Sequence, residues 1–194
     1  MKRELGVVMC GLLVLTVAAA AQASTPKSKP KKEEHRTVTQ MLDRNVSNFE
    51  HEFTSTAEAM PEDKYGFAPT NGEFKGVRTF AEQIKHVAAV NYELGASILE
   101  EKPPAEINSE AGPDSVTSKE DVLKYLKESF VYVHKAIATV NEKNLVETVR
   151  SPFGEGRVTR LGLVMSVTGH GYDHYGQMVE YLRMNGIIPP SSRY

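Results

Sequence analysis

The chain has 194 residues, of which 40% are hydrophobic and 25% are charged, a composition typical of a soluble globular protein with one ordinary domain. The formal net charge of −2 leaves no basic surplus to neutralise phosphates, which argues against nucleic acid as a partner. The single cysteine, Cys10, excludes an intramolecular disulfide.

The N-terminal segment, residues 1–23, has the pattern of a signal peptide. Two basic residues near its start precede an apolar run, residues 5–21, and Ala21 and Ala23 offer small side chains at the cleavage positions. We therefore expect an exported bacterial protein, periplasmic or extracellular, whose mature chain lacks cysteine. The alternative is a retained N-terminal anchor, and only in that case do we expect contact with a membrane.

The following segment, residues 24–36 (STPKSKPKKEEHR), is rich in Lys and Pro and has nothing to bury. Such a composition predicts a short disordered linker. The remainder, residues 37–190, is expected to form one domain.

Within that domain, apolar residues recur at steps of three and four in four stretches, residues 37–60, 79–101, 118–140 and 159–183. Ser118 can cap the third stretch and Thr159 the fourth, while Gly186 can end the last one. These patterns predict an all-α, up-down four-helix bundle.

The connections between the predicted helices are rich in Gly, Pro and Asn. In residues 61–78 we expect Phe67 and Phe74 to pack onto the end of the bundle. A small hairpin between residues 146–149 and Val158 is a further expectation.

The fourth stretch contains the sequence GHGYDHYGQ at residues 169–177. His170 and His174 are four residues apart and lie on one face of a helix, where two imidazoles can bind one divalent ion if a third ligand arrives from elsewhere. A single pair with this spacing also occurs often by chance. The three glycines cost roughly 1 kcal/mol each in a helix, so close helix contact or space for a bound group is expected there.

A third histidine, His86, lies at the edge of the buried face of the second predicted helix. In a bundle it can point inward, where facing helices build metal sites. Three protein ligands would leave a coordination position open, which is typical of a catalytic rather than a purely structural ion. For the other helix histidines, His51 is expected to face solvent, and His134 to be structural or exposed.

Four segments together resemble one known family, the DinB-like superfamily: MPEDKY at 60–65, FAEQIKHVA at 80–88, GH at 169–170 and DHYGQ at 173–177. The resemblance extends from about Thr37 to Pro189. It implies a four-helix bundle with a divalent metal bound by His86, His170 and His174. All-imidazole ligation favours zinc or nickel, and iron or manganese would also be compatible.

Three polar residues near these histidines are candidates for supporting roles. Gln177 continues the stripe of the histidine pair and could face the open coordination side. Glu82 or Asp173 could orient an imidazole as hydrogen-bond acceptors. No residue is assigned as catalytic.

Similar proteins include thiol-dependent transferases and isomerases, so the resemblance implies a metal that activates a small thiol. An exported protein would instead suit metal-dependent hydrolysis of a small-molecule substrate. The alternative is a non-catalytic metal-binding or dimeric interaction module of the cell envelope. The oligomeric state stays open, although paired bundles are common among similar proteins.

Overall fold

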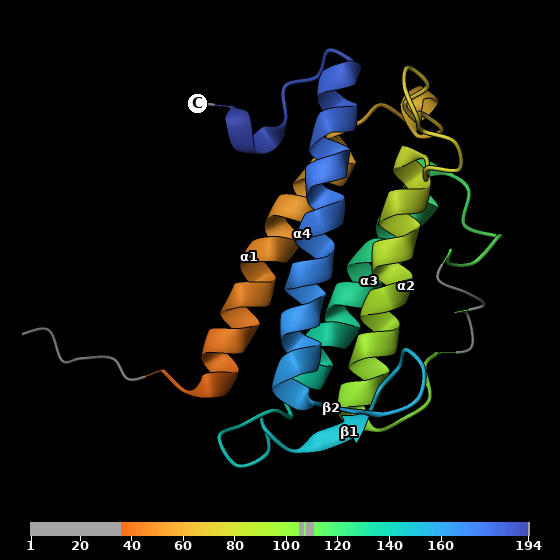
Figure 1. Ribbon diagram of the computed structural model, residues 1–194. Coiled ribbons are helices and arrows are strands. Elements are labelled where there is room, and N and C mark those ends of the chain that lie inside the picture. Colours follow the sequence, from red (N-terminus) through yellow and green to blue (C-terminus); the bar gives the residue numbers. More distant parts are fainter. Residues whose placement is uncertain (1–35, 105–106, 108–110, 194) are drawn as a thin grey trace, which may run out of the picture. The chain divides into compact units, whose positions relative to one another are not determined.

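The computed structural model describes residues 36–104, 107 and 111–193. This part of the chain is predominantly helical (Figure 1), with four α-helices, α1 (Val38–Ala59), α2 (Phe80–Leu99), α3 (Lys119–Ile137) and α4 (Arg160–Met184). Two short strands, β1 (Thr148–Arg150) and β2 (Arg157–Thr159), and two 3-10 turns, η1 (Glu62–Lys64) and η2 (Pro190–Ser192), complete it. The predicted signal peptide and nearly all of the predicted linker lie outside the described residues.

Each α-helix begins at a hydroxyl side chain that caps it. The caps are Thr37, Thr79, Ser118 and Thr159, and each accepts a hydrogen bond from a backbone N–H in the first turn. At its other end α4 stops before Gly186, whose φ of +72° favours glycine. The four predicted helices are confirmed, with boundaries close to those expected.

The helices pack around one apolar core. Its largest fully buried side chains include four phenylalanines, Phe49, Phe53, Phe80 and Phe130. The predicted stripe of α2 is buried throughout. The third helix is slightly shorter than the predicted stretch, residues 118–140: α3 ends at Ile137, and Val140 joins the core from the following turn.

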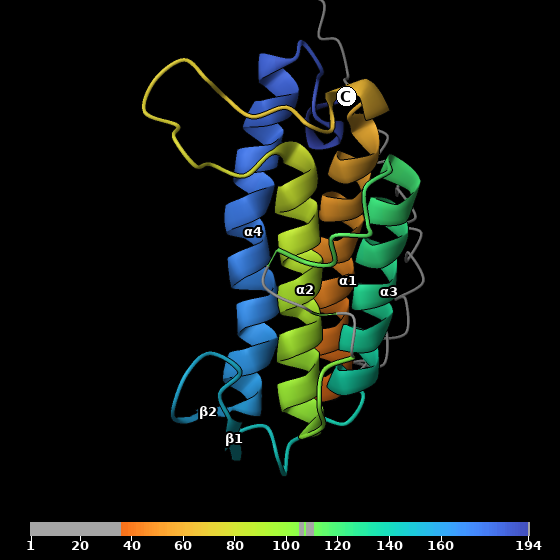
Figure 2. The ribbon, with the colours of Figure 1, turned by 90° about the vertical axis from the view of Figure 1, so that its right-hand side faces the viewer.

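The predicted up-down order of the helices is also wrong. Asn91 of α2 bonds to Ser129 of α3, and Gly95 packs on Tyr132, so residue numbers rise together and the two helices run parallel. Helices α1 and α3 are antiparallel, since Lys119 at the start of α3 donates to the carbonyl of Met60. The order is therefore up-down-down-up, and α2 lies between α3 and α4 (Figure 2).

Strands β1 and β2 form the expected small hairpin, beside the C-terminal end of α2 and the N-terminal end of α4 (Figure 1). At the opposite end, the loop after η1 packs Phe67 edge-on against Tyr181, as predicted. Phe74 differs from the prediction: its side chain is exposed in the glycine-flanked part of that loop. Among the described helices, none is sufficiently long and apolar to cross a membrane.

Candidate metal centre

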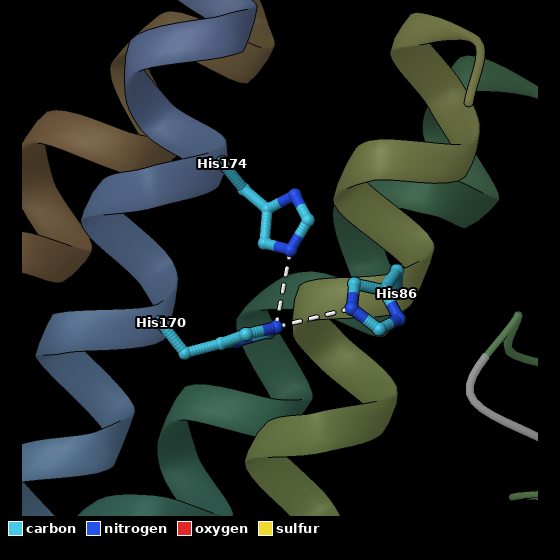
Figure 3. Close-up of side chains that lie close together, drawn as sticks. All are labelled: His86, His170 and His174. Carbon is cyan, nitrogen blue, oxygen red and sulfur yellow. Dashed lines mark hydrogen bonds between the residues drawn. The ribbon is translucent and has the colours of Figure 1, made fainter. Parts of the chain in front are cut away.

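Three histidine side chains converge between α2 and α4 (Figure 3). Nε2 of His170 lies 3.0 Å from Nε2 of His86 and 3.1 Å from Nε2 of His174. One ligand atom from each ring lies within 4.8 Å of the others. The three residues that the sequence predicted as ligands are therefore brought together, from two helices that are separated by 60 residues of chain, 100–159.

Helix geometry places each ring in this arrangement. His170 and His174 project one above the other from the same face of α4. α2 runs antiparallel to α4, because Arg160 at the start of α4 bonds to the carbonyl of Ile98 near the end of α2. His86 therefore faces the α4 pair from across the groove. His86 and His174 are buried, whereas His170 is partly exposed.

The distances between these nitrogens suit a single small cation. Around a zinc ion with Zn–N distances of about 2.0–2.1 Å, tetrahedral ligand nitrogens lie about 3.3 Å apart. The observed separations of 3.0 and 3.1 Å are close to this value. The three imidazoles thus fit a divalent metal that prefers nitrogen ligands.

A chain of side-chain hydrogen bonds leads from the protein surface to His174. Gln177 Nε2 donates to Asp173 Oδ2 over 3.1 Å, and Gln83 Nε2 donates to Gln177 Oε1 over 2.9 Å. Nδ1 of His174 then contacts Gln83 Oε1. We call these three residues, Asp173, Gln177 and Gln83, the amide relay.

The direction of the amide relay fixes the proton on His174. An ionised carboxylate can only accept, so Gln177 must turn its NH₂ group to Asp173 and its oxygen to Gln83. Gln83 must then turn its own oxygen to His174, whose Nδ1 therefore carries the proton. Nε2 of His174 is therefore unprotonated, and its lone pair points toward the other two histidines, as metal ligation requires.

Burial of the His174 ring also favours its neutral form. The pKa of His174 is lowered to about 4, chiefly because burial penalises the charged form and secondly because the rings of His170 and His86 are close. The imidazole is therefore neutral at physiological pH. A neutral ring is the form that binds a metal.

The predicted supporting residues have different places. Gln177 and Asp173 belong to the amide relay, and Asp173 reaches the ring of His174 only through the two glutamines. The side chain of Glu82 instead closes the N-terminus of α2, accepting hydrogen bonds from the backbone N–H and the hydroxyl of Thr79. These contacts lower the pKa of Glu82. They leave Glu82 at the cap of the helix.

Gln83 is the contact that sequence reasoning missed. It stands three residues before His86 and therefore lies on the same face of α2, which is the signal that could have identified it. Its side chain is almost fully buried, with 1% exposed. A buried glutamine one turn from a metal ligand is a natural candidate for orienting another ligand.

The nitrogens open onto a cavity of about 650 Å³ between α2 and α4. Its lining includes all three histidines and the amide relay, together with residues 76–78 of the loop before α2 and Phe153 of the hairpin. A small molecule can therefore approach the histidines from solvent.

The glycines of α4 have different roles. A Cβ atom on Gly171 would lie 2.0 Å from the ring of Phe49, so the absence of a side chain lets α1 approach α4 closely. Gly169 and Gly176 face open space. The expectation of close helix contact is thus confirmed at Gly171 alone.

The two remaining helix histidines are elsewhere. His51 is exposed on α1, as predicted. His134 lies between two carboxylates of α1, with Nδ1 2.6 Å from Asp43 and Nε2 3.0 Å from Glu50. It is structural, and it links α3 to α1.

A family model described as the DinB superfamily matches residues 47–178, a range that contains all three converging histidines. The chain belongs to the DinB superfamily. Among curated proteins, none matches the sequence.

Solved structures agree with the DinB superfamily fold. A DinB-like protein from Bacillus cereus superposes with a TM-score of 0.62 at 14% identity, covering 81% of this chain and 98% of that one. A conserved protein from Enterococcus faecalis gives 0.60 at 17% identity, covering 77% and 98%. A DinB-like protein from Bacillus subtilis gives 0.56 at 16% identity, covering 75% and 92%. At these identities the likeness concerns the fold.

Proposed function

We propose that this DinB superfamily chain binds one divalent metal ion through Nε2 of His86, His170 and His174 and acts as a metal-dependent enzyme on a small molecule. The convergence of three nitrogens at the wall of a solvent-accessible cavity carries the proposal. Zinc or nickel is favoured, because all three donors are imidazoles, and iron or manganese is compatible. When bound, such an ion is a Lewis acid that polarises a substrate and lowers the pKa of a nucleophile in contact with it.

The protein's own side chains would prepare the site for that ion. The amide relay holds the proton of His174 at Nδ1 and leaves Nε2 unprotonated. Burial of His86 and His174 restricts their motion and access of bulk water to their rings. Preorganisation of this kind lowers the cost of orienting ligands when the metal binds.

The reaction class is either hydrolysis or transfer of a thiol. We favour hydrolysis, since we also propose that residues 1–23 export the protein and small thiol cofactors belong mainly to the cytosol. A metal-binding module without turnover is the second candidate. The cavity of about 650 Å³ beside the histidines favours the enzyme, because a sequestering site needs no room for a substrate.

Metal analysis of the mature protein tests the site. We expect about one ion per chain in the wild type and a loss of most bound metal in His86→Ala and in His174→Ala. His51→Ala removes an exposed histidine of α1 and serves as the matched control, which should retain its metal. Full occupancy in both site variants would exclude the three-histidine site.

Activity and export need separate measurements. The metal-loaded protein would be screened against ester and amide substrates and against thiols with electrophiles, with His174→Ala as the blank. Turnover of neither group by the loaded wild type would favour the binding module. For export, N-terminal sequencing of the protein from a bacterial periplasm or medium should begin at Ser24, whereas an intact N-terminus would contradict cleavage after Ala23.

A further inference from the structure

The cavity at the three histidines extends along the groove between α2 and α4. Its lining on α2 runs from Gln83 to Leu94, a rise of about 16 Å along a helix. On α4 the lining runs in the opposite direction, from Gln177 to Ser166. Since Gln83 bonds to Gln177, the amide relay marks one end of the groove and Leu94 the other, with the histidines between them.

The end beside the amide relay carries two opposite charges, the guanidinium of Arg78 and the carboxylate of Asp173. Arg78 lines the cavity there and directly precedes Thr79, the cap of α2. Its backbone is held by a 3.1 Å hydrogen bond from the hydroxyl of Tyr181 to its carbonyl. Within the described residues, its guanidinium forms neither an ion pair nor a hydrogen bond. Its charge acts on Glu82, whose pKa is lowered chiefly by the hydrogen bonds from Thr79 and to a smaller extent by Arg78.

A divalent ion at the histidines would make the groove favour an anion, because the charges of Arg78 and Asp173 otherwise balance. Arg78 and Asp173 are the ionised residues in the lining, and the carboxylate of Asp173 accepts a hydrogen bond from Gln177. A divalent ion bound by the three histidines would add two positive charges to the middle of the groove. A guanidinium without a partner is suited to paired hydrogen bonds from its N–H groups to a carboxylate or a phosphate.

The opposite end of the groove is apolar. Val90 and Leu94 of α2 form its wall, and Phe153 reaches it from the tip of the hairpin. Phe153 is 49% exposed, and the turn that carries it is fixed by a 3.2 Å hydrogen bond from its backbone N–H to Ser151 Oγ. Figure 2 shows this hairpin and the loop that carries Arg78 at opposite ends of α2 and α4.

We propose that the groove selects molecules with an anionic group at one end and an apolar group at the other. The anion pairs with Arg78, the apolar part packs on Leu94 and Phe153, and the reacting bond lies between them at the histidines. This inference gives the substrate class of the proposed metal enzyme and therefore rests on that function. Arg78 and Phe153 are specificity residues in this scheme.

Calorimetry with simple probes tests the anionic end. Octanoate and octyl phosphate carry the two kinds of anion, and octanamide has the shape of octanoate without its charge. We expect zinc-loaded protein to bind at least one anion about tenfold more tightly than octanamide, and the stronger of the two to identify the headgroup. Arg78→Gln should remove this preference. Lys75→Gln, an exposed cation in the same loop and outside the cavity lining, should keep it.

Chain length tests the apolar end. In the wild type, affinity should rise from octanoate to dodecanoate, whose longer chain spans more of the groove, and Phe153→Ser should reduce that rise several-fold. Phe74→Ser removes an exposed phenylalanine outside the cavity lining and should leave it unchanged. Equal binding of the anions and octanamide, or equal binding of the anions by wild type and Arg78→Gln, would overturn the proposal, as would an unchanged rise in Phe153→Ser.

A measurement without metal separates this proposal from the proposed function. The same titrations in His86→Ala detect the contribution of Arg78 and Phe153 when the ion is lost, and they also reveal an anion that binds the zinc instead of Arg78. If the wild type binds none of zinc, nickel, iron and manganese, the proposed function fails. Dodecanoate binding that still depends on Arg78 and Phe153 would then retain the groove as a site for amphipathic anions.

Discussion

At the scale of single residues, the proton position on one imidazole depends on a carboxylate that does not touch it. Asp173 sets the orientation of Gln177, which sets that of Gln83, which sets the tautomer of His174. The histidines themselves could be predicted from their spacing and from the family resemblance. Gln83 could not, because its role depends on how far α2 and α4 are rotated about their axes, which sequence periodicity fixes only to within a helix face.

The adjacent residues Glu82 and Gln83 have different roles in the structure: Gln83 orients His174, and Glu82 closes the N-terminus of α2. Gln83→Leu should lower the affinity for zinc about 10–100-fold, because His174 loses the acceptor that fixes its tautomer. Glu82→Ala should leave the affinity unchanged and should reduce stability by about 1 kcal/mol through loss of the helix cap. Competition with a chelator measures the first effect and urea denaturation the second. A larger loss of zinc affinity in Glu82→Ala would contradict the amide relay.

At the scale of helices, the contacts between neighbouring elements decide which positions tolerate change. The sequence predicted where the helices begin, because hydroxyl caps and apolar periodicity are local signals. The sequence did not predict that the glycines at positions 169, 171 and 176 of α4 have separate roles. Gly171 alone meets a ring of α1, whereas Gly169 and Gly176 face open space.

This difference gives a paired prediction. Gly171→Ala should destabilise the fold by about 1–3 kcal/mol, because the new methyl group would overlap the ring of Phe49, a fully buried core residue. Gly176→Ala should be neutral or should stabilise by up to about 1 kcal/mol, as alanine is the better helix former. Urea denaturation of both variants in the presence of a chelator is the measurement. Equal stabilities would mean that α1 and α4 do not approach closely at Gly171.

The contact between α3 and α1 predicts a pH dependence. Hydrogen bonds to Glu50 and Asp43 raise the pKa of His134 above its usual 6.5. A raised pKa in the folded state stabilises the protein fully below the unfolded pKa, and this stabilisation is lost as the pH rises through the folded value. His134→Gln should therefore lower Tm more at about pH 5.5 than at about pH 9. His51→Gln, the control, should change Tm little at either pH. A larger loss of Tm at pH 9 than at pH 5.5 in His134→Gln would contradict the stabilising role of the protonated His134.

At the scale of the whole molecule, the order of the helices was the feature that sequence reasoning got wrong. Apolar periodicity shows which face of a helix is buried and carries no information on its direction. The connection between α2 and α3, residues 100–118, is nevertheless long enough to run back along the length of a helix. Its length was the sequence signal that α2 and α3 could be parallel. Placement of the ligands survived this error, because His86 faces α4 in the observed order as well.

Metal removal should destabilise the whole fold, because the proposed ion links α2 to α4. Free zinc at about a hundred times its Kd should stabilise the wild type by about 2.7 kcal/mol, and a chelator should reverse the gain. His86→Ala should show little response to either reagent. Thermal unfolding followed by circular dichroism measures both. An identical zinc response in the variant would place the stabilising ion elsewhere.

His86 and His170 are 84 positions apart in the chain, and this separation determines when the site comes into being. An unfolded polypeptide threaded through a membrane would have no coordination sphere to carry, since the two contributing helices meet only after the bundle has assembled. If the proposed export passes the chain across the membrane unfolded, the ion would consequently be taken up at the destination, from the metals that this compartment supplies.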